Sequence, residues 1–317
     1  MNNLITGIHH VTAITSAAQT NLDFYGGVLG LRLLKQTVNF DAKNVYHFYY
    51  GTIPGTPGSV ITFFPYAGLT PGRHGKGMLN TTTFSVSADS ISYWEDRLKK
   101  YGISYKPLRE RFKNEVFIYL EDTDGLGIEL VFNDNDQREG YSNGFVPKQH
   151  SIKGIYNVEI WEEGYERTGA LLTMQLDHKC IAQEGNRYRY AVKDEPGKYV
   201  DLVCTPESLK GLAGSGTVHH LAFSTPGAEE QLKLREILVN RSLNVTPVLD
   251  RNYFTSLYFR EPGGVLFEIA TAGPGFTVDE EEAQLGTALK LPSQFEAERA
   301  FIEASLPVVD FDKKNFN

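Results

Sequence analysis

Residues 7–14 read GIHHVTAI, and residues 216–223 repeat this pattern as GTVHHLAF. Two weaker echoes lie between them, GMLNTT at residues 77–82 and GIYNVEI at residues 154–160. Each of these stretches is a short run after a glycine, which indicates a β-strand. A unit that returns four times along a chain of 317 residues predicts a fold built from repeated modules.

Each of these strands is followed by a stretch with the spacing of a helix and then by further strand-like runs. The helical pattern is clearest at residues 90–101, which stop before Gly102, and it returns at residues 229–240 in the fourth copy. The strands that close the four copies are GSVITFF (58–64), GIELVF (127–132), KYVDLVC (198–204) and GVLFEIA (264–270). The repeated unit is therefore βαβββ.

Four such modules predict an α+β protein in which two curved sheets form open barrels. The polar loop at residues 134–149 separates the second copy from the third, so we expect one domain at 1–135 with modules one and two, and another at 150–273 with modules three and four. Residues 274–317 are expected to form a helical tail. The acidic run at 279–282 is interpreted as the first turn of a helix rather than as a cation site.

The charge and composition exclude some classes of protein. The formal net charge is −8, and the sequence shows no basic surplus of the kind that nucleic acid would need. No apolar run reaches the roughly 18 residues of a membrane span, and the first residues carry no export signal, so we expect a soluble, cytoplasmic protein. Cys180 and Cys204 stand far apart and are expected to be reduced thiols without a role.

The two equivalent inward positions of the modules carry different residues. On the first and closing strands, in chain order, these are His10 and Thr62, Thr81 and Glu129, Asn157 and Asp201, and His220 and Glu268. Thr81 and Glu129 are separated by the same number of residues as His220 and Glu268, so these two copies are in register. Two histidines and a carboxylate meet only if the first and the fourth copies come together.

His10, His220 and Glu268 form the ligand set that binds one face of a non-heme Fe(II) ion and leaves the other face open. Mn(II) accepts the same donors, so the expected metal is Fe(II), with Mn(II) as the alternative. Glu129 is interpreted as a remnant, because the second and third copies have no histidine at these positions. Alternation along a strand does not decide which histidine of each doublet points inward, although His10 shares a face with the polar Thr12.

Four further histidines have no counterpart in the repeat, and we expect them in loops or at the solvent surface. They are His47, His74, His150 and His178. A histidine on a strand is more often a structural residue than a metal ligand, so only the doublets at matching repeat positions are assigned to a metal.

The sequence resembles the vicinal oxygen chelate superfamily of glyoxalases, bleomycin resistance proteins and dioxygenases, and within it the dioxygenases that open para-hydroquinone rings. The resemblance runs along nearly the whole chain. It rests on ITGIHHVT (5–12), DFY (23–25), LGL (29–31), GTPG (55–58), GTVHHLAF (216–223) and PGGVLFEIAT (262–271). No fragment is diagnostic alone, but the order and spacing of the fragments are specific.

The resemblance implies an Fe(II)-dependent, extradiol-type ring cleavage. The second histidine of each doublet, His10 and His220, would bind iron with Glu268. Iron would take the ionised hydroxyl of a hydroquinone-like aromatic together with O₂, and both oxygen atoms would be inserted as the ring opens. The implied partners are thus an aromatic small molecule and O₂, and the sequence leaves a homo-oligomer open.

The same resemblance implies that Tyr258, Arg251, His219 and Thr12 lie at the catalytic cavity. Tyr and Arg can donate hydrogen bonds to a developing oxyanion, and His219 can act as acid or base if it faces the cavity. The second hydroxyl of a para-hydroquinone does not reach the same iron, so Arg251 or Tyr258 is expected to anchor it. Taken alone, Tyr258 also fits an ordinary strand aromatic, and Arg251 fits a surface cation.

Two other functions stay open from the sequence. A glyoxalase-like isomerase uses the same modules with Zn²⁺ or Ni²⁺, but that chemistry typically needs a second carboxylate where Thr62 stands. A non-catalytic resistance protein that sequesters small molecules is the third candidate, and the complete ligand set speaks against it.

Overall fold

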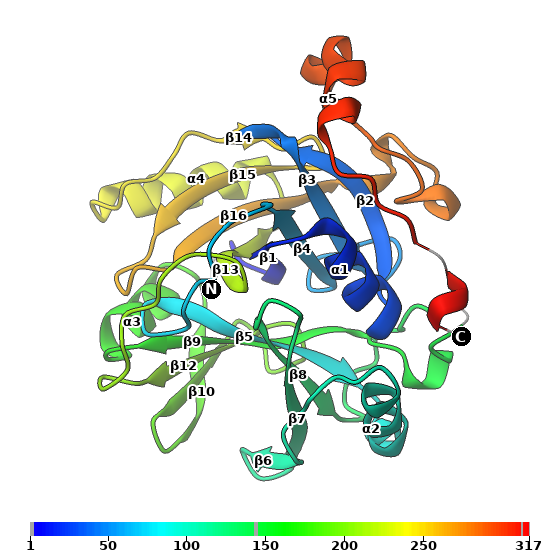
Figure 1. Cartoon of the computed structure of the whole chain (residues 1–317). Coiled ribbons are helices and arrows are strands. Elements are labelled where there is room, and N and C mark those ends of the chain that lie inside the picture. Colours follow the sequence, from blue (N-terminus) through cyan, green and yellow to red (C-terminus); the bar gives the residue numbers. More distant parts are fainter. Residues whose placement is uncertain (1–2, 143–144, 312, 317) are drawn as a thin grey trace.

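Two curved eight-stranded sheets lie one above the other and form the body of the protein (Figure 1). This computed structural model describes residues 3–142, 145–311 and 313–316. The first sheet has the order β14 (Leu249–Asp250), β15 (Phe254–Arg260), β16 (Leu266–Pro274), β13 (Thr217–Thr225), β1 (Gly7–Thr15), β4 (Val60–Pro65), β3 (Ala42–Gly51), β2 (Arg32–Asn39). The second has the order β10 (Lys179–Glu184), β11 (Arg187–Ala191), β12 (Tyr199–Cys204), β9 (Gly154–Glu162), β5 (Met78–Val86), β8 (Gly127–Phe132), β7 (Glu115–Glu121), β6 (Arg109–Arg111).

One helix follows the first strand of every module, as the repeat predicts. These helices are α1 (Ala18–Leu22), which continues as a π-helix at Asp23–Val28, α2 (Ile91–Lys100), α3 (Glu166–Met174) and α4 (Ala228–Asn240). Short 3-10 turns lie at Ala88–Ser90 and Lys148–His150. α2 ends before Gly102, whose φ of 67° is a left-handed conformation that glycine tolerates best. The predicted α+β fold of four βαβββ modules is confirmed.

The first and closing strands of every module run parallel and in the same register. The pairs that face each other are Thr12 and Thr62, Thr83 and Glu129, Glu159 and Asp201, and Ala222 and Glu268. In each pair, the first residue lies two positions after the one that the repeat alignment matched to the closing strand. The offset is the same in all four copies, which supports the alignment of the repeats.

The sheets do not follow the two halves of the sequence. β1 pairs antiparallel with β13, and β5 pairs antiparallel with β9. The first sheet thus combines modules one and four, and the second combines modules two and three, whereas the expected division at 1–135 and 150–273 grouped one with two and three with four. The connections after β4 and β12 each cross to the other sheet, and they run side by side through bridges such as that between Arg73 and Leu212. The first strand of each module thus has its open edge covered by the first strand of another module.

The expected linker at residues 134–149, of which 143–144 lie outside the described residues, fastens the two sheets together. Arg138 donates hydrogen bonds to the carbonyl oxygen of Gly58 at 3.0 Å and to that of Ile155 at 2.7 Å. Its guanidinium also binds the carboxylate of Asp136. Gly58 belongs to module one and Ile155 to module three, so one side chain bridges the sheets.

The tail after β16 is built of helical turns, in line with the helical extension predicted for residues 274–317. Its described residues contain 3-10 turns at Phe276–Val278, Glu282–Gln284, Ser293–Glu298 and Lys313–Phe316, and the α-helix α5 (Arg299–Ser305), which stands out from the body (Figure 1). Among the helices of the described ranges, none is long and apolar enough to span a membrane.

Of the acidic run at residues 279–282, only Glu282 lies in the first turn of a helix, the 3-10 helix Glu282–Gln284, so the interpretation holds for that residue and not for Asp279 or Glu280. The carboxylates of Asp279 and Glu280 both accept hydrogen bonds from Nζ of Lys35, at 2.5 Å in the case of Asp279. Lys35 is fully buried on β2, and a buried ammonium group requires carboxylate partners. Asp279 and Glu280 therefore pin the tail to the first sheet through their ion pairs with Lys35.

Candidate metal centre

A β-bulge interrupts the alternation of side chains at each histidine doublet. Along the β1–β13 ladder, the pairing skips His9 on one strand and His219 on the other. Such an extra residue re-aims the neighbouring side chains and kinks the strand. The β5–β9 ladder skips Asn80 and Tyr156, which hold the same repeat positions, so the bulge belongs to the module itself.

His10, His220 and Glu268 come together on the concave side of the first sheet, as the sequence predicts. They lie on the neighbouring strands β1, β13 and β16, and all three side chains are buried. Nε2 of His220 lies 2.9 Å from Oε2 of Glu268 and 3.2 Å from Nε2 of His10. Nε2 of His10 lies 3.6 Å from the same carboxylate oxygen. The three donor atoms thus converge on a single point.

The donor atoms fit a divalent metal ion. Adjacent ligands of an octahedral ion are about 3.0 Å apart when the bonds are roughly 2.1 Å long, close to the separations found here. Oε2 of Glu268 is buried without a hydrogen-bond donor, while Oε1 accepts a hydrogen bond from Ser256. Burial, with the charge of Arg251, lowers the pKa of His220 to about 3, so its imidazole is neutral, as a metal ligand must be.

Hydrogen bonds to the neighbouring histidines orient both ligand rings. Nε2 of His9 donates to the carbonyl oxygen of Thr271 at 3.1 Å, since a carbonyl can only accept. Burial lowers the pKa of His9 to about 4, so the ring is neutral and its Nδ1 accepts a hydrogen bond from Nδ1 of His10 at 2.8 Å. This assignment leaves the lone pair of His10 Nε2 directed at Glu268. The same contact of 2.8 Å joins Nδ1 of His219 to Nδ1 of His220.

A cavity of about 360 Å³ opens in front of the three donors, within the range of small-molecule sites, roughly 300–1,000 Å³. Aromatic and aliphatic side chains form much of its wall. The lining residues are His10, Asn39, Phe40, Asp41, His47, Tyr49, Phe64, Tyr66, His219, His220, Thr246, Leu249, Arg251, Phe254, Tyr258, Leu266 and Glu268. The cavity is therefore suited to an apolar ring that carries a few polar groups.

Three of the four residues that the resemblance placed at the cavity line its wall. Tyr258 and Arg251 lie together, because Nε of Arg251 donates a hydrogen bond to the Tyr258 hydroxyl at 3.2 Å. Burial and the charge of Glu268 raise the pKa of Tyr258 well above its ordinary value, so the hydroxyl is protonated. His219 is exposed at the cavity mouth. Thr12 lies behind the wall, where its hydroxyl is 2.7 Å from that of Thr62.

His47 is a cavity residue that the sequence did not identify. It was expected in a loop or at the surface, but it is buried on β3 and lines the cavity. Its Nε2 lies 2.9 Å from the Thr62 hydroxyl, and its Nδ1 lies 2.9 Å from the Tyr49 hydroxyl. Because no other copy has a histidine at this position, the repeat offered no signal. The apolar run VYHFYY at residues 45–50, with His47 inside it, was the available indication of burial.

The other three unmatched histidines make local hydrogen-bonding contacts. His178 lies in a loop, as expected, but it is buried, and its Nδ1 lies 2.5 Å from the carbonyl oxygen of Leu176. His74 is partly buried in a loop, and His150 is partly buried at the end of the 3-10 turn Lys148–His150. Nε2 of His74 lies 2.8 Å from the carbonyl oxygen of Gly216, and Nδ1 of His150 lies 2.9 Å from the Ser90 hydroxyl.

The equivalent positions of the second sheet are filled by ion pairs. Nη1 of Arg111 lies 2.7 Å from Oε2 of Glu129, and Arg187 and Arg189 bind Asp201 at 3.0 and 2.7 Å. Guanidinium groups thus neutralise these buried carboxylates. Across the described residues, only the three donors of the first sheet form a group of histidine, cysteine or carboxylate side chains close enough to share an ion.

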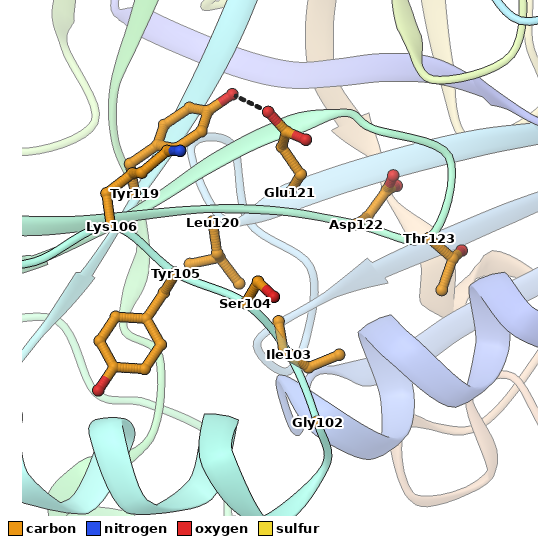
Figure 2. Close-up of a pocket in the computed structure, with 10 residues that line it drawn as sticks. All are labelled: Gly102, Ile103, Ser104, Tyr105, Lys106, Tyr119, Leu120, Glu121, Asp122 and Thr123. Carbon is orange, nitrogen blue, oxygen red and sulfur yellow. Dashed lines mark hydrogen bonds between the residues drawn. The ribbon is translucent and has the colours of Figure 1, made fainter.

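A second hollow, of about 340 Å³, lies on module two. Figure 2 shows its lining, which consists of residues 102–106 after α2 and residues 119–123 around the end of β7. The hydroxyl of Tyr119 donates a hydrogen bond to Glu121 at 3.0 Å, as drawn there. No histidine or cysteine lines this hollow, in contrast to the first cavity.

Proteins that are similar to this chain include several named as dioxygenases. A protein of Bacillus subtilis (strain 168), provisionally named ring-cleaving dioxygenase MhqO, is 41% identical over 300 residues, which cover 95% of each chain. A chlorohydroquinone/hydroquinone 1,2-dioxygenase of Sphingobium indicum is 32% identical over 302 residues, 92% of this chain and 93% of the other. A crystal structure from Bacillus subtilis, described provisionally as a dioxygenase, has a TM-score of 0.93 and 40% identity, and covers 98% of this chain and 99% of its own.

The sequence profile of one superfamily matches residues 7–130 and 159–269, which overlap all four modules. The two matched segments contain the three donor atoms, both histidine doublets and the wall of the cavity from Asn39 to Glu268. This chain belongs to the Glyoxalase/Bleomycin resistance protein/Dioxygenase superfamily.

Proposed function

We propose that this protein is a ring-cleaving dioxygenase that acts on a para-hydroquinone-like aromatic, with Fe(II) held by His10, His220 and Glu268. The observation that carries the proposal is the convergence of two imidazole nitrogens and one unpartnered carboxylate oxygen at an aromatic-lined cavity. This donor set suits an iron ion that must leave room for a substrate and O₂. The relatives named as ring-cleaving and hydroquinone dioxygenases support the same class of reaction. Extradiol-type cleavage with insertion of both oxygen atoms is part of the proposal.

The cavity residues account for recognition of the substrate. When bound, the metal ion makes a coordinated hydroxyl more acidic and lets electrons pass between the aromatic ring and O₂. The second hydroxyl of a para-hydroquinone lies on the far side of the ring and needs a separate partner. Arg251 and Tyr258, already joined by a hydrogen bond, offer donors for it on the cavity wall. We expect this pair to distinguish hydroquinones from phenols that lack the second hydroxyl.

Two further imidazoles lie at the cavity. The ring of His219 is exposed at the mouth, and its Nδ1 lies 2.8 Å from Nδ1 of His220, so it orients that ligand ring. Burial lowers the pKa of His219 to about 3, which disfavours a role as a proton acceptor. His47 lies in the wall with its Nδ1 close to the Tyr49 hydroxyl and its Nε2 close to Thr62. Because Thr62 also contacts Thr12, a buried polar chain supports His47 from behind the cavity.

A glyoxalase-like isomerase is less well supported by the side chains. That chemistry typically uses a second carboxylate in the metal shell, and the first module would supply it at Thr62. The Thr62 hydroxyl instead lies within hydrogen-bonding distance of Thr12 and His47. A non-catalytic binding protein has no need for three convergent metal donors, so the oxygenase is the better match.

Anaerobic purification followed by elemental analysis and oxygen-uptake measurements tests the proposal. We expect stoichiometric iron, and uptake of one O₂ per molecule of methylhydroquinone, with no isomerisation of a hemithioacetal. Uptake with catechol but not with methylhydroquinone would retain the class and replace the substrate. Isomerisation without oxygen uptake would refute the dioxygenase. The variant His220→Ala should lose both iron and turnover, because it removes one of three ligands.

A further inference from the structure

The mouth of the cavity lies between the two opposite edges of the first sheet. β2 and β14 are the terminal strands of that sheet, yet both edges contribute to the same cavity. The β2–β3 turn supplies Asn39, Phe40 and Asp41, and the chain around β14 supplies Leu249 and Arg251. Curvature of the sheet therefore brings its two edges within reach of each other at the point where a substrate must enter.

Phe40 makes the contact that bridges these edges. The guanidinium carbon of Arg251 lies 5.2 Å from the centre of the Phe40 ring, a cation–π distance. Arg251 also lies 5.3 Å from the centre of the Tyr258 ring and donates a hydrogen bond to its hydroxyl. The guanidinium thus contacts both Phe40, at one edge, and Tyr258 on β15, the strand next to the other edge. Loss of the Phe40 ring would both widen the mouth and loosen Arg251.

The tail supports Phe40 from outside the cavity. The chain beyond β16 follows β2, where N–H of Lys290 donates a hydrogen bond to the Gln36 carbonyl oxygen at 2.9 Å. The next turn, Ser293–Glu298, places Phe295 with its ring centre 6.3 Å from that of Phe40. Lys43, on β3 just after the turn, binds Glu298 at 2.6 Å.

We propose that Phe40 is a specificity-determining residue of this enzyme: its ring covers the cavity mouth over Arg251 and limits the size of the hydroquinone that enters. Phe295 and the ion pair of Lys43 with Glu298 hold the β2–β3 turn in the covering position. The size limit on hydroquinones rests on the proposed function, whereas the closure of the mouth rests on the contacts alone. The tail is accordingly part of the substrate-binding apparatus rather than an appendage.

Two measurements on the Fe(II)-loaded protein test this proposal. The first is the rate at which a small chelator, bipyridine, and a bulky one, bathophenanthroline disulfonate, remove the metal. The second is the ratio of kcat/KM for tert-butylhydroquinone to that for methylhydroquinone. Phe40→Ala should raise the rate with the bulky chelator and the kcat/KM ratio by about tenfold each, with little change for bipyridine.

Two further variants separate the effect of Phe40 from a general loss of structure. Phe295→Ala removes the support without touching the cavity and should change both quantities in the same direction by a smaller factor. Phe301→Ala removes an aromatic side chain that is 72% exposed on α5 of the same tail, and it should change neither. Phe40→Leu keeps an apolar contact and should raise the bulky-chelator rate and the kcat/KM ratio by less than Phe40→Ala. It replaces Phe40→Ala as the test variant if the alanine variant folds poorly.

The proposal would be overturned if folded Phe40→Ala or Phe40→Leu lost its metal to the bulky chelator at the rate of the unchanged protein and kept the same kcat/KM ratio. A change of the same size in Phe301→Ala would also overturn it, because the effect would then not come from the mouth. If the unchanged protein turns over no hydroquinone, the proposed function fails, while the chelator rates still decide whether Phe40 covers the cavity.

Discussion

The two histidines of each doublet have different roles although they are neighbours in the chain. On a regular strand, adjacent side chains point to opposite faces, and alternation would send one of each pair away from the cavity. The bulges at His9 and His219 remove this restriction, so both rings of a doublet lie next to each other. The second histidine then offers Nε2 to a metal, and the first orients it through Nδ1.

At this scale we predict that His9→Phe weakens metal binding without removing it. The substitution keeps an aromatic ring of similar size but loses the hydrogen bond to Nδ1 of His10, and loss of such an orienting partner typically costs about 10- to 100-fold in metal affinity. Competition of the protein with a chelator for Fe(II) measures this affinity. The matched control is Tyr156→Phe, at the equivalent bulge of the second sheet, which should leave the affinity unchanged. Equal affinities in His9→Phe and the control would refute the orienting role.

At the scale of elements, the end of β9 meets the β15–β16 turn through two buried carboxylates. The Thr168 hydroxyl donates a hydrogen bond to Oε2 of Glu261 at 2.6 Å, and its oxygen also lies 3.3 Å from Oε1 of Glu162. Burial, with the charge of Glu261, raises the pKa of Glu162 from 4.5 to about 8. The hollow beside the pair is also lined by Lys76, Glu163, Glu166, Arg167 and Lys210. The contact between the sheets therefore depends on a proton.

The sign of this dependence follows from the raised pKa. The folded protein retains a proton that the unfolded chain releases above a pH of about 4.5, so the stabilisation from Glu162 is complete below that value and is lost as the pH approaches 8. We predict that Glu162→Gln, which resembles the protonated form, gains in Tm relative to the unchanged protein between about pH 5 and pH 8. Thermal unfolding of both proteins at about pH 5 and pH 8 measures this difference in Tm. Glu163→Gln, at the exposed neighbouring position, should show no such trend.

Arg138 also connects elements of the two sheets, through its hydrogen bonds to the carbonyl oxygens of Gly58 and Ile155. We predict that Arg138→Ala lowers the free energy of unfolding by about 2–4 kcal/mol, because two hydrogen bonds from a charged group to backbone carbonyl oxygens are lost. Urea denaturation measures this quantity. Arg109→Ala, at an exposed position of β6, should change it little. A similar loss in both variants would show that the bridge between the sheets is not what stabilises the fold.

At the scale of the whole molecule, two equivalent places serve different purposes. The first sheet brings together three side chains that could hold a metal ion, and in the second sheet guanidinium groups pair with the carboxylates at the matching positions. We predict that Glu129→Gln keeps the metal but destabilises the protein, because it weakens the buried pair with Arg111. Glu268→Gln should have the opposite effect: it should lose the metal but keep most of the stability of the protein. Elemental analysis and thermal unfolding of both variants check this, and loss of iron in Glu129→Gln would move the metal to the second sheet.

The sequence by itself determined the module and its four copies. These are local properties, because strand periodicity and repeat spacing are set by residues that are near one another in the chain. The triad of His10, His220 and Glu268 was a prediction that also needed the family resemblance, which favoured the second histidine of each doublet. The acidic run at 279–282 shows the limit of local reasoning. Its charges suit the start of a helix, yet two of its carboxylates accept hydrogen bonds from Lys35, which is far away in the sequence.

Only the tertiary structure decided that modules one and four share a sheet, that bulges re-aim the doublets, and that His47 lies in the cavity. All four first strands are similar, so nothing local selects the partner of β1. The crossing connections make that choice through contacts between residues far apart in the chain. The same is true of Phe40, which reaches Arg251 only because the sheet curves until its two edges meet.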